Sequence, residues 1–106
     1  RILEFDVSCP SDTVNQPVVS FDYVFASDEY NEWADSIYND VFAFFLNGMN
    51  IALIPNTAIP VAIVNVNNVD FNQYFYDNDL DENQGGVPYP NFEADGFTTT
   101  FTAQGA

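Results

Sequence analysis

Short runs in which apolar and polar residues alternate recur along this chain, and each run ends at a turn signal. The clearest run covers residues 19–25, where the odd-numbered positions are Val, Phe, Tyr and Phe and the positions between them include Ser20 and Asp22. A period of two places the apolar side chains on one face of an extended strand. No longer stretch follows the helical period, so the chain is predicted to be all-β.

Further strands are expected on both sides of this run. Residues 3–7 alternate in the same way, with Leu3, Phe5 and Val7 on one face. Residues 41–46 are apolar at every position, which is typical of a central strand covered on both sides. Asn47-Gly48 follows directly, and this dipeptide favours the positive φ angles of a type I′ hairpin turn.

Two later runs, residues 61–66 and 97–102, complete a set of six or seven predicted short strands. Strands at such intervals indicate an antiparallel β-sandwich or jelly roll. Residues 67–95 are rich in Asn, Asp, Tyr and Pro, and are expected to form a long surface loop. A chain of 106 residues has room for one domain, so residues 1–106 are predicted to be a single β-sandwich module.

Composition excludes several classes of function. The chain has 16 acidic residues against one basic residue, a net charge of −15, and it has no His. A body this negative repels nucleic acid and anionic lipid, and the absence of His removes Ser-His and Cys-His nucleophile pairs. Its longest apolar run is too short to span a membrane. A small sandwich offers little depth for tuning a pair of catalytic acids, so we expect no enzyme.

The same acidity favours an extracellular location, where Ca²⁺ is abundant enough to occupy weak carboxylate sites. The apolar fraction of 47% and the aromatic fraction of 17% separate the chain from acidic disordered proteins. Cys9 is the single cysteine, which excludes a disulfide within the chain and leaves its state open. The sequence shows neither an initiator Met nor a leader pattern, as expected of a mature product or a fragment.

One candidate metal site lies between residues 27 and 40. Asp28 and Glu29 stand at one end of this segment and Asn39 and Asp40 at the other. Crowded carboxylates repel one another, and Ca²⁺ takes six to eight oxygen ligands of these types. The alternative is an acidic loop that is simply solvated.

A second candidate Ca²⁺ site holds Asp77, Asp79 and Asp81 at positions 1, 3 and 5 of an EF-hand-like register. The register then fails, because Glu82 stands where the turn glycine belongs and Pro88 where the bidentate Glu belongs. A looser Ca²⁺ loop and a flexible polar insertion both remain open for this segment.

Aromatic residues near the first acidic segment suggest a binding surface. Tyr30, Trp33 and Tyr38 lie within it, and Tyr74, Tyr76 and Tyr89 also lie in or beside predicted loops. Such rings stack on sugars or fill protein interfaces, and they can equally cap the core. Tyr30, Trp33 and Tyr38 are our candidate ligand or interface aromatics.

Two long stretches of the sequence are distinctive: Phe-Asp-Tyr-Val-Phe-Ala-Ser-Asp-Glu-Tyr-Asn-Glu-Trp at 21–33 and Asn-Asp-Val-Phe-Ala-Phe-Phe-Leu at 39–46. In these stretches the chain resembles the choice-of-anchor L domain of secreted bacterial surface proteins, and the match runs from about Leu3 to Ala103. Residues 50–55, 60–61 and 95–99 also match. The resemblance implies a β-rich extracellular module, and it places the family's acidic signature on residues 27–30 and 39–40.

The resemblance also implies further strands after residue 99, whereas this sequence stops at Ala106. We therefore expect the N-terminal part of a longer family domain, or a fold that a partner strand completes. Head-to-tail completion between identical copies would build a filament. The leading hypothesis is a non-enzymatic, Ca²⁺-supported structural or adhesion module that assembles into a surface layer or filament. The alternative is a carbohydrate-binding module that uses loop aromatics.

Overall fold

A computed structural model describes residues 1–8, 17–31, 39–83 and 86–106. All strand pairs in these ranges are antiparallel, which confirms the predicted all-β class. The only helical pieces described are a 3₁₀ turn, η1 (Asn72–Tyr74), and a four-residue helix, α1 (Leu80–Asn83). The strands are β1 (Val19–Tyr23), β2 (Ala26–Ser27), β3 (Val41–Phe42), β4 (Phe45–Leu46), β5 (Met49–Asn50), β6 (Val61–Ala62), β7 (Phe75–Asp77), β8 (Gly96–Thr98) and β9 (Phe101–Gly105).

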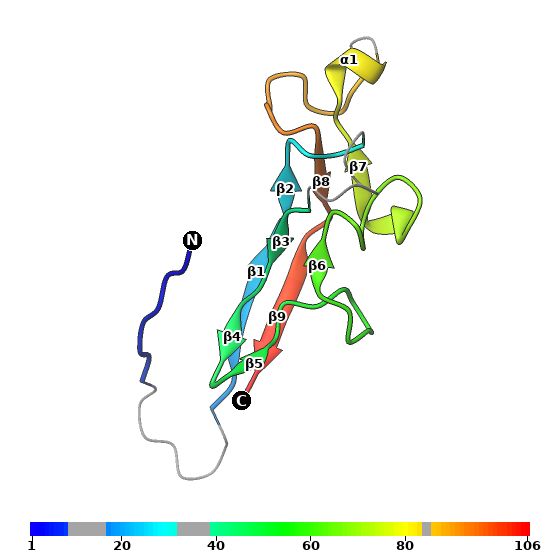
Figure 1. Cartoon of the computed structure of the whole chain (residues 1–106). Coiled ribbons are helices and arrows are strands. Elements are labelled where there is room, and N and C mark those ends of the chain that lie inside the picture. Colours follow the sequence, from blue (N-terminus) through cyan, green and yellow to red (C-terminus); the bar gives the residue numbers. More distant parts are fainter. Residues whose placement is uncertain (9–16, 32–38, 84–85) are drawn as a thin grey trace.

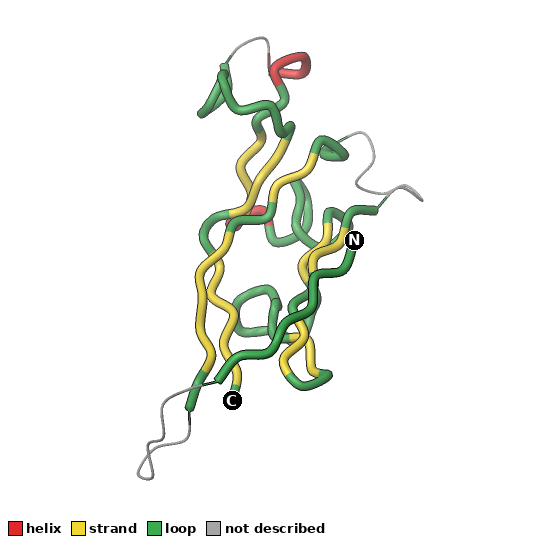
Figure 2. Tube along the Cα trace, turned by 90° about the vertical axis from the view of Figure 1, so that its left-hand side faces the viewer, coloured by secondary structure: helices red, strands yellow, loops and turns green. Residues whose placement is uncertain are grey.

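The strands form two groups that face each other (Figures 1 and 2). One group contains the β1–β9 ladder and, beyond it, the three-stranded sheet β2-β8-β7. The other contains the pairs β3–β6 and β4–β5. Aromatic rings join the groups: Phe21 lies 4.5 Å from Phe44, and Tyr23 lies 5.0 Å from Phe42, between ring centroids. The finer assignment to a sandwich or jelly roll stays a prediction.

The hydrophobic core lies where these groups meet. Its largest buried side chains include Tyr30, Ile54, Ile63 and Phe101. Strand β1 contributes the face predicted from its alternation, because Phe21 and Tyr23 are partly buried while the residues between them are exposed. The predicted hairpin is also confirmed.

The hairpin joins β4 to β5 through Asn47 and Gly48, whose φ angles are 50° and 84°. Positive φ at both central positions is what a type I′ turn requires, and Asn and Gly adopt it at little cost. The local sequence therefore sets this turn.

The prediction of one doubly covered strand at 41–46 is wrong. This stretch divides into β3 and β4, which pair with different partners, and its alternate residues Val41 and Phe45 are exposed. The Asn50 side chain explains the division, because its Oδ1 accepts hydrogen bonds from the backbone N–H groups of Phe44 and Ala52. A side-chain acceptor here replaces part of the regular ladder.

Three further expectations need correction. Residues 3–7 have the strand period but form no strand, and Leu3, Phe5 and Val7 are 86%, 59% and 61% exposed. The expected strand at 61–66 ends after residue 62, where backbone bonds from residues 65 and 66 return to the Ala62 carbonyl. The expected strand at 97–102 is two strands, because Thr99 donates its N–H to Tyr74 between β8 and β9.

The segment at 67–95 is more ordered than a surface loop. It contains η1, β7 and α1, and β7 pairs with β8 from Phe75↔Thr98 to Asp77↔Gly96. Its Asn and Asp side chains satisfy backbone groups, which is why polar residues can build structure there.

Candidate functional site

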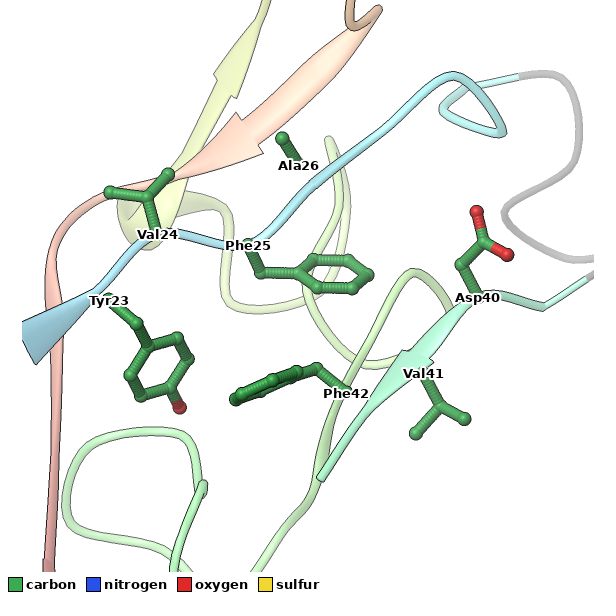
Figure 3. Close-up of a pocket in the computed structure, with 7 residues that line it drawn as sticks. All are labelled: Tyr23, Val24, Phe25, Ala26, Asp40, Val41 and Phe42. Carbon is green, nitrogen blue, oxygen red and sulfur yellow. The ribbon is translucent and has the colours of Figure 1, made fainter. Parts of the chain in front are cut away.

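A cleft of about 410 Å³ opens between the strand edge at residues 23–26 and the edge at residues 40–42. Figure 3 shows the rings of Tyr23, Phe25 and Phe42 turned toward the space between these two segments, with Asp40 at the far rim. The walls are therefore mainly aromatic and the rim is acidic.

The Tyr23 hydroxyl is buried at this cleft without a hydrogen-bond partner. Burial raises the pKa of Tyr23 from its ordinary value of 10.0 to about 12, since the charged phenolate would lose its hydration. The hydroxyl therefore stays protonated at neutral pH. An unpaired buried hydroxyl is costly, so the stability of this region depends on its ring contacts.

Two ends of the first acidic segment meet near the cleft. The Ser27 hydroxyl donates a hydrogen bond to Asp40 Oδ2 at 2.5 Å, and the same Ser27 oxygen accepts from the Glu29 backbone N–H at 3.0 Å. Asp28 is exposed beside them. Asn39 lies further along, where its Oδ1 accepts from the Val64 N–H at 3.3 Å. The structure thus places Asp40 next to residues 27–29.

The second acidic segment is used for local capping. Asp79 Oδ1 accepts from the backbone N–H groups of Asp81 and Glu82 at 2.9 and 3.0 Å, at the start of α1. Asp77 Oδ1 accepts from the Asp79 N–H and from the Asn83 side-chain amide. Carboxylates at a helix start satisfy its free N–H groups. These bonds explain Asp77 and Asp79 without a bound ion, and they leave Asp81 exposed.

Within the described ranges, no three His, Cys, Asp or Glu side chains form a group that could hold a metal ion. The two Ca²⁺ sites therefore stay predictions. No helix in the same ranges is long and apolar enough to cross a membrane.

The structure removes Tyr30 from the candidate ligand aromatics. Its side chain is fully buried, packed against Phe25 and Phe75 with ring centroids at 6.3 and 4.6 Å. Burial raises the pKa of Tyr30, and the negative charge of Asp40 raises it further. Tyr30 belongs to the core and cannot present its ring to a ligand. Trp33 and Tyr38, like Cys9, lie outside the described residues.

A different set of aromatics borders a second groove, of about 520 Å³. Tyr76, Tyr89 and Phe92 are 45%, 58% and 45% exposed, and each ring contacts the buried ring of Phe97 at centroid distances of 5.2, 5.6 and 5.6 Å. The sequence analysis noted Tyr76 and Tyr89 as aromatics in or beside loops, but it did not relate them to Phe92 or Phe97. The four rings come together through the β7–β8 pair and the loop before β8.

Asn78 fixes that loop. The side chain is 2% exposed, and its Nδ2 donates to the backbone carbonyls of Tyr89, Phe92 and Ala94 at 3.0–3.1 Å. Its Oδ1 accepts from the Tyr89 N–H at 3.0 Å. One buried amide thus holds the backbone that carries two of the exposed rings.

In a comparison with protein families, residues 1–106 match the model described as "Choice-of-anchor L domain". The chain belongs to this family. Comparisons with curated proteins and with solved structures gave no match.

Choice-of-anchor L membership confirms the resemblance found in the sequence and points to a module of bacterial cell-surface proteins. The family is a structural domain of surface proteins, which is consistent with a non-enzymatic role.

Proposed function

We propose that this choice-of-anchor L chain is a non-enzymatic structural module of the bacterial surface that assembles with copies of itself by strand addition. In this proposal, Ca²⁺ binds at the acidic corner, which we define by Asp28, Glu29 and Asp40. The observation that carries the assembly part is the segment at residues 1–8. It runs apart from the labelled strands (Figure 1) and exposes the apolar side chains of Leu3, Phe5 and Val7 on alternate positions. No strand of the described residues pairs with this segment, and a strand pattern in that state is suited to pairing with another chain.

The strand edges supply acceptors for such a segment. Among the described residues, β9 pairs only with β1, and β3 pairs only with β6, so each ladder has an open side. Exposed apolar side chains also follow the β3–β5 region, at Val41, Phe45 and Met49. Both features favour docking of an extended apolar strand.

Charge is the obstacle to assembly and the reason for including Ca²⁺. Each copy carries a net charge of −15, so two copies repel at low ionic strength. Divalent cations bound near Asp28, Glu29 and Asp40 would reduce that repulsion. The contact between Ser27 and Asp40 supports this corner as the place where oxygen ligands gather.

The assembly proposal is tested by light scattering coupled to size exclusion, at protein concentrations from micromolar to millimolar with Ca²⁺ present. We expect a mass that rises with concentration for the wild type, and a monomer for Phe5→Asp, which places a charge on the apolar face. Glu4→Gln, on the opposite face, serves as the matched control and should still assemble. A wild-type chain that stays monomeric throughout would exclude assembly.

The Ca²⁺ proposal is tested separately by thermal unfolding in excess Ca²⁺ and in excess chelator. A ligand at 100 times its Kd stabilises the folded state by about 2.7 kcal/mol. We expect this gain in wild type and its loss in Asp40→Asn, while Asp81→Asn should keep it if the corner at Asp40 is the site. Equal melting temperatures with Ca²⁺ and chelator would remove Ca²⁺ from the proposal.

A further inference from the structure

The aromatic groove beside β8 is lined by none of the residues that the assembly proposal uses, so strand addition does not explain why its aromatic side chains are exposed. We define this aromatic groove by Tyr76, Tyr89, Phe92 and Phe97, with Thr99 and Thr100 on its border. Three of its rings are about half exposed although each contacts the same buried ring. Half-exposed rings keep a face for a ligand while the central ring fixes their positions.

The groove is held in place before any ligand arrives. The buried Asn78 amide donates to the carbonyls of Tyr89, Phe92 and Ala94 and accepts from the Tyr89 N–H, which fixes this stretch of backbone. Tyr76 belongs to β7, which the ladder to β8 holds in register. A ligand that binds here therefore does not have to order the loop, and this lowers the entropy cost of binding.

The chemistry of the lining selects the class of ligand. The rings offer apolar faces, whereas the phenol groups of Tyr76 and Tyr89 and the hydroxyls of Thr99 and Thr100 offer hydrogen bonds at the edges. A sugar ring has the complementary surface, with C–H groups on its face and hydroxyls around its rim. A purely apolar partner would leave these hydroxyls unpaired.

The charge of the chain limits which sugars the groove can bind. No basic residue lines the groove, and the chain's single basic residue, Arg1, lies in the exposed segment at residues 1–8. With a net charge of −15, the chain repels uronates, sialic acids and phosphorylated glycans. We infer that the aromatic groove binds a neutral polysaccharide by stacking sugar rings on Tyr76, Tyr89 and Phe92.

The inference is tested by calorimetric titration with cellohexaose, laminarihexaose, xylohexaose, mannohexaose and chitohexaose, with oligogalacturonate as the anionic probe. The titrations are run in chelator at low protein concentration, so that Ca²⁺ binding and assembly do not contribute. We expect at least one neutral oligosaccharide to bind, and Tyr89→Ala and Phe92→Ala to weaken it about fivefold or more. Val69→Ala, an exposed apolar truncation outside the groove and outside the proposed assembly surface, is the matched control and should bind as wild type does.

Near-UV circular dichroism of each variant establishes that the fold is kept, which is expected because the truncated rings are half exposed. Failure of all five neutral sugars to bind wild type would overturn the inference, as would equal affinities for wild type and Tyr89→Ala. Preferential binding of oligogalacturonate would overturn the neutral class. Retention on octyl-agarose that Tyr89→Ala abolishes, without sugar binding, would identify an apolar protein interface instead. None of these outcomes bears on the assembly proposal, which is measured in Ca²⁺ and through other residues.

Discussion

Asn78→Ala should destabilise the chain more than any other single loss of a polar side chain described here. Asn78 is buried, and its amide makes four hydrogen bonds to the loop that leads into β8. Alanine removes all four partners at once. The carbonyls of Tyr89, Phe92 and Ala94 then lose a donor, and the Tyr89 N–H loses its acceptor.

The magnitude follows from the number of bonds and their burial. A hydrogen bond within a protein contributes about 0.5–1.5 kcal/mol net. The Asn78 amide has two N–H groups for three carbonyls and accepts one further bond, so it makes the equivalent of about three full bonds, or about 1.5–4.5 kcal/mol. Residues 89–93 are exposed, and water can replace part of what is lost. We therefore expect a loss of about 2–4 kcal/mol, a large share of the ~5–15 kcal/mol that stabilises a typical domain.

Urea unfolding followed by fluorescence measures this loss as a lower midpoint at constant m-value. Asn83→Ala is the control, because its amide donates two hydrogen bonds, to Asp77 and to the Asp79 carbonyl, but its side chain is exposed. We expect less than about 1 kcal/mol for the control. Equal losses for Asn78→Ala and Asn83→Ala would refute the argument that burial makes Asn78 decisive.

Three other substitutions test the core and the cleft. Gly96→Ala should cost about 1–3 kcal/mol by crowding, because a Cβ there would lie 2.5 Å from ring atoms of Phe75 and Tyr30; an unchanged urea midpoint would show that these rings can move aside. Ile54→Ala should cost about 2–5 kcal/mol in the same assay, since the side chain is fully buried, and a loss below about 1 kcal/mol would contradict that burial. Burial raises the pKa of Tyr23 from 10.0 to about 12, so between these values the folded chain keeps the phenol proton while the unfolded chain loses it. The contribution of this group to the free energy of unfolding is complete below pH 10 and declines as the pH rises toward 12. Tyr23→Phe should reduce that decline when unfolding is compared at pH 8 and pH 11, and an identical decline in both proteins would assign it to other groups.

The two acidic segments show how similar compositions acquire different structural roles. In the second segment, Asp77 and Asp79 accept backbone N–H groups at the start of α1, which accounts for their positions. In the first segment, Asp40 instead bonds the hydroxyl of Ser27 from across the segment. Only the second arrangement is local in the chain, so only its capping role follows from nearby residues.

The sequence alone determined those features that depend on neighbouring residues. The Asn47-Gly48 turn follows from backbone preferences at two positions, and the buried face of β1 follows from its alternation. The all-β class and the family were also readable from the sequence, because pattern and motif are properties of the chain itself. The sequence alone did not determine which of its apolar and polar side chains are buried.

The tertiary structure decided which apolar and polar residues meet, because burial and pairing depend on segments that are distant along the chain. Tyr30 was a candidate ligand aromatic until the structure placed it against Phe25 and Phe75. Residues 3–7 have a strand's alternation, but a strand also needs a neighbour with free hydrogen-bonding groups, and the described residues supply none to them. Asn78 gained its role only because residues 89–94 fold back onto it, a contact that no local period encodes.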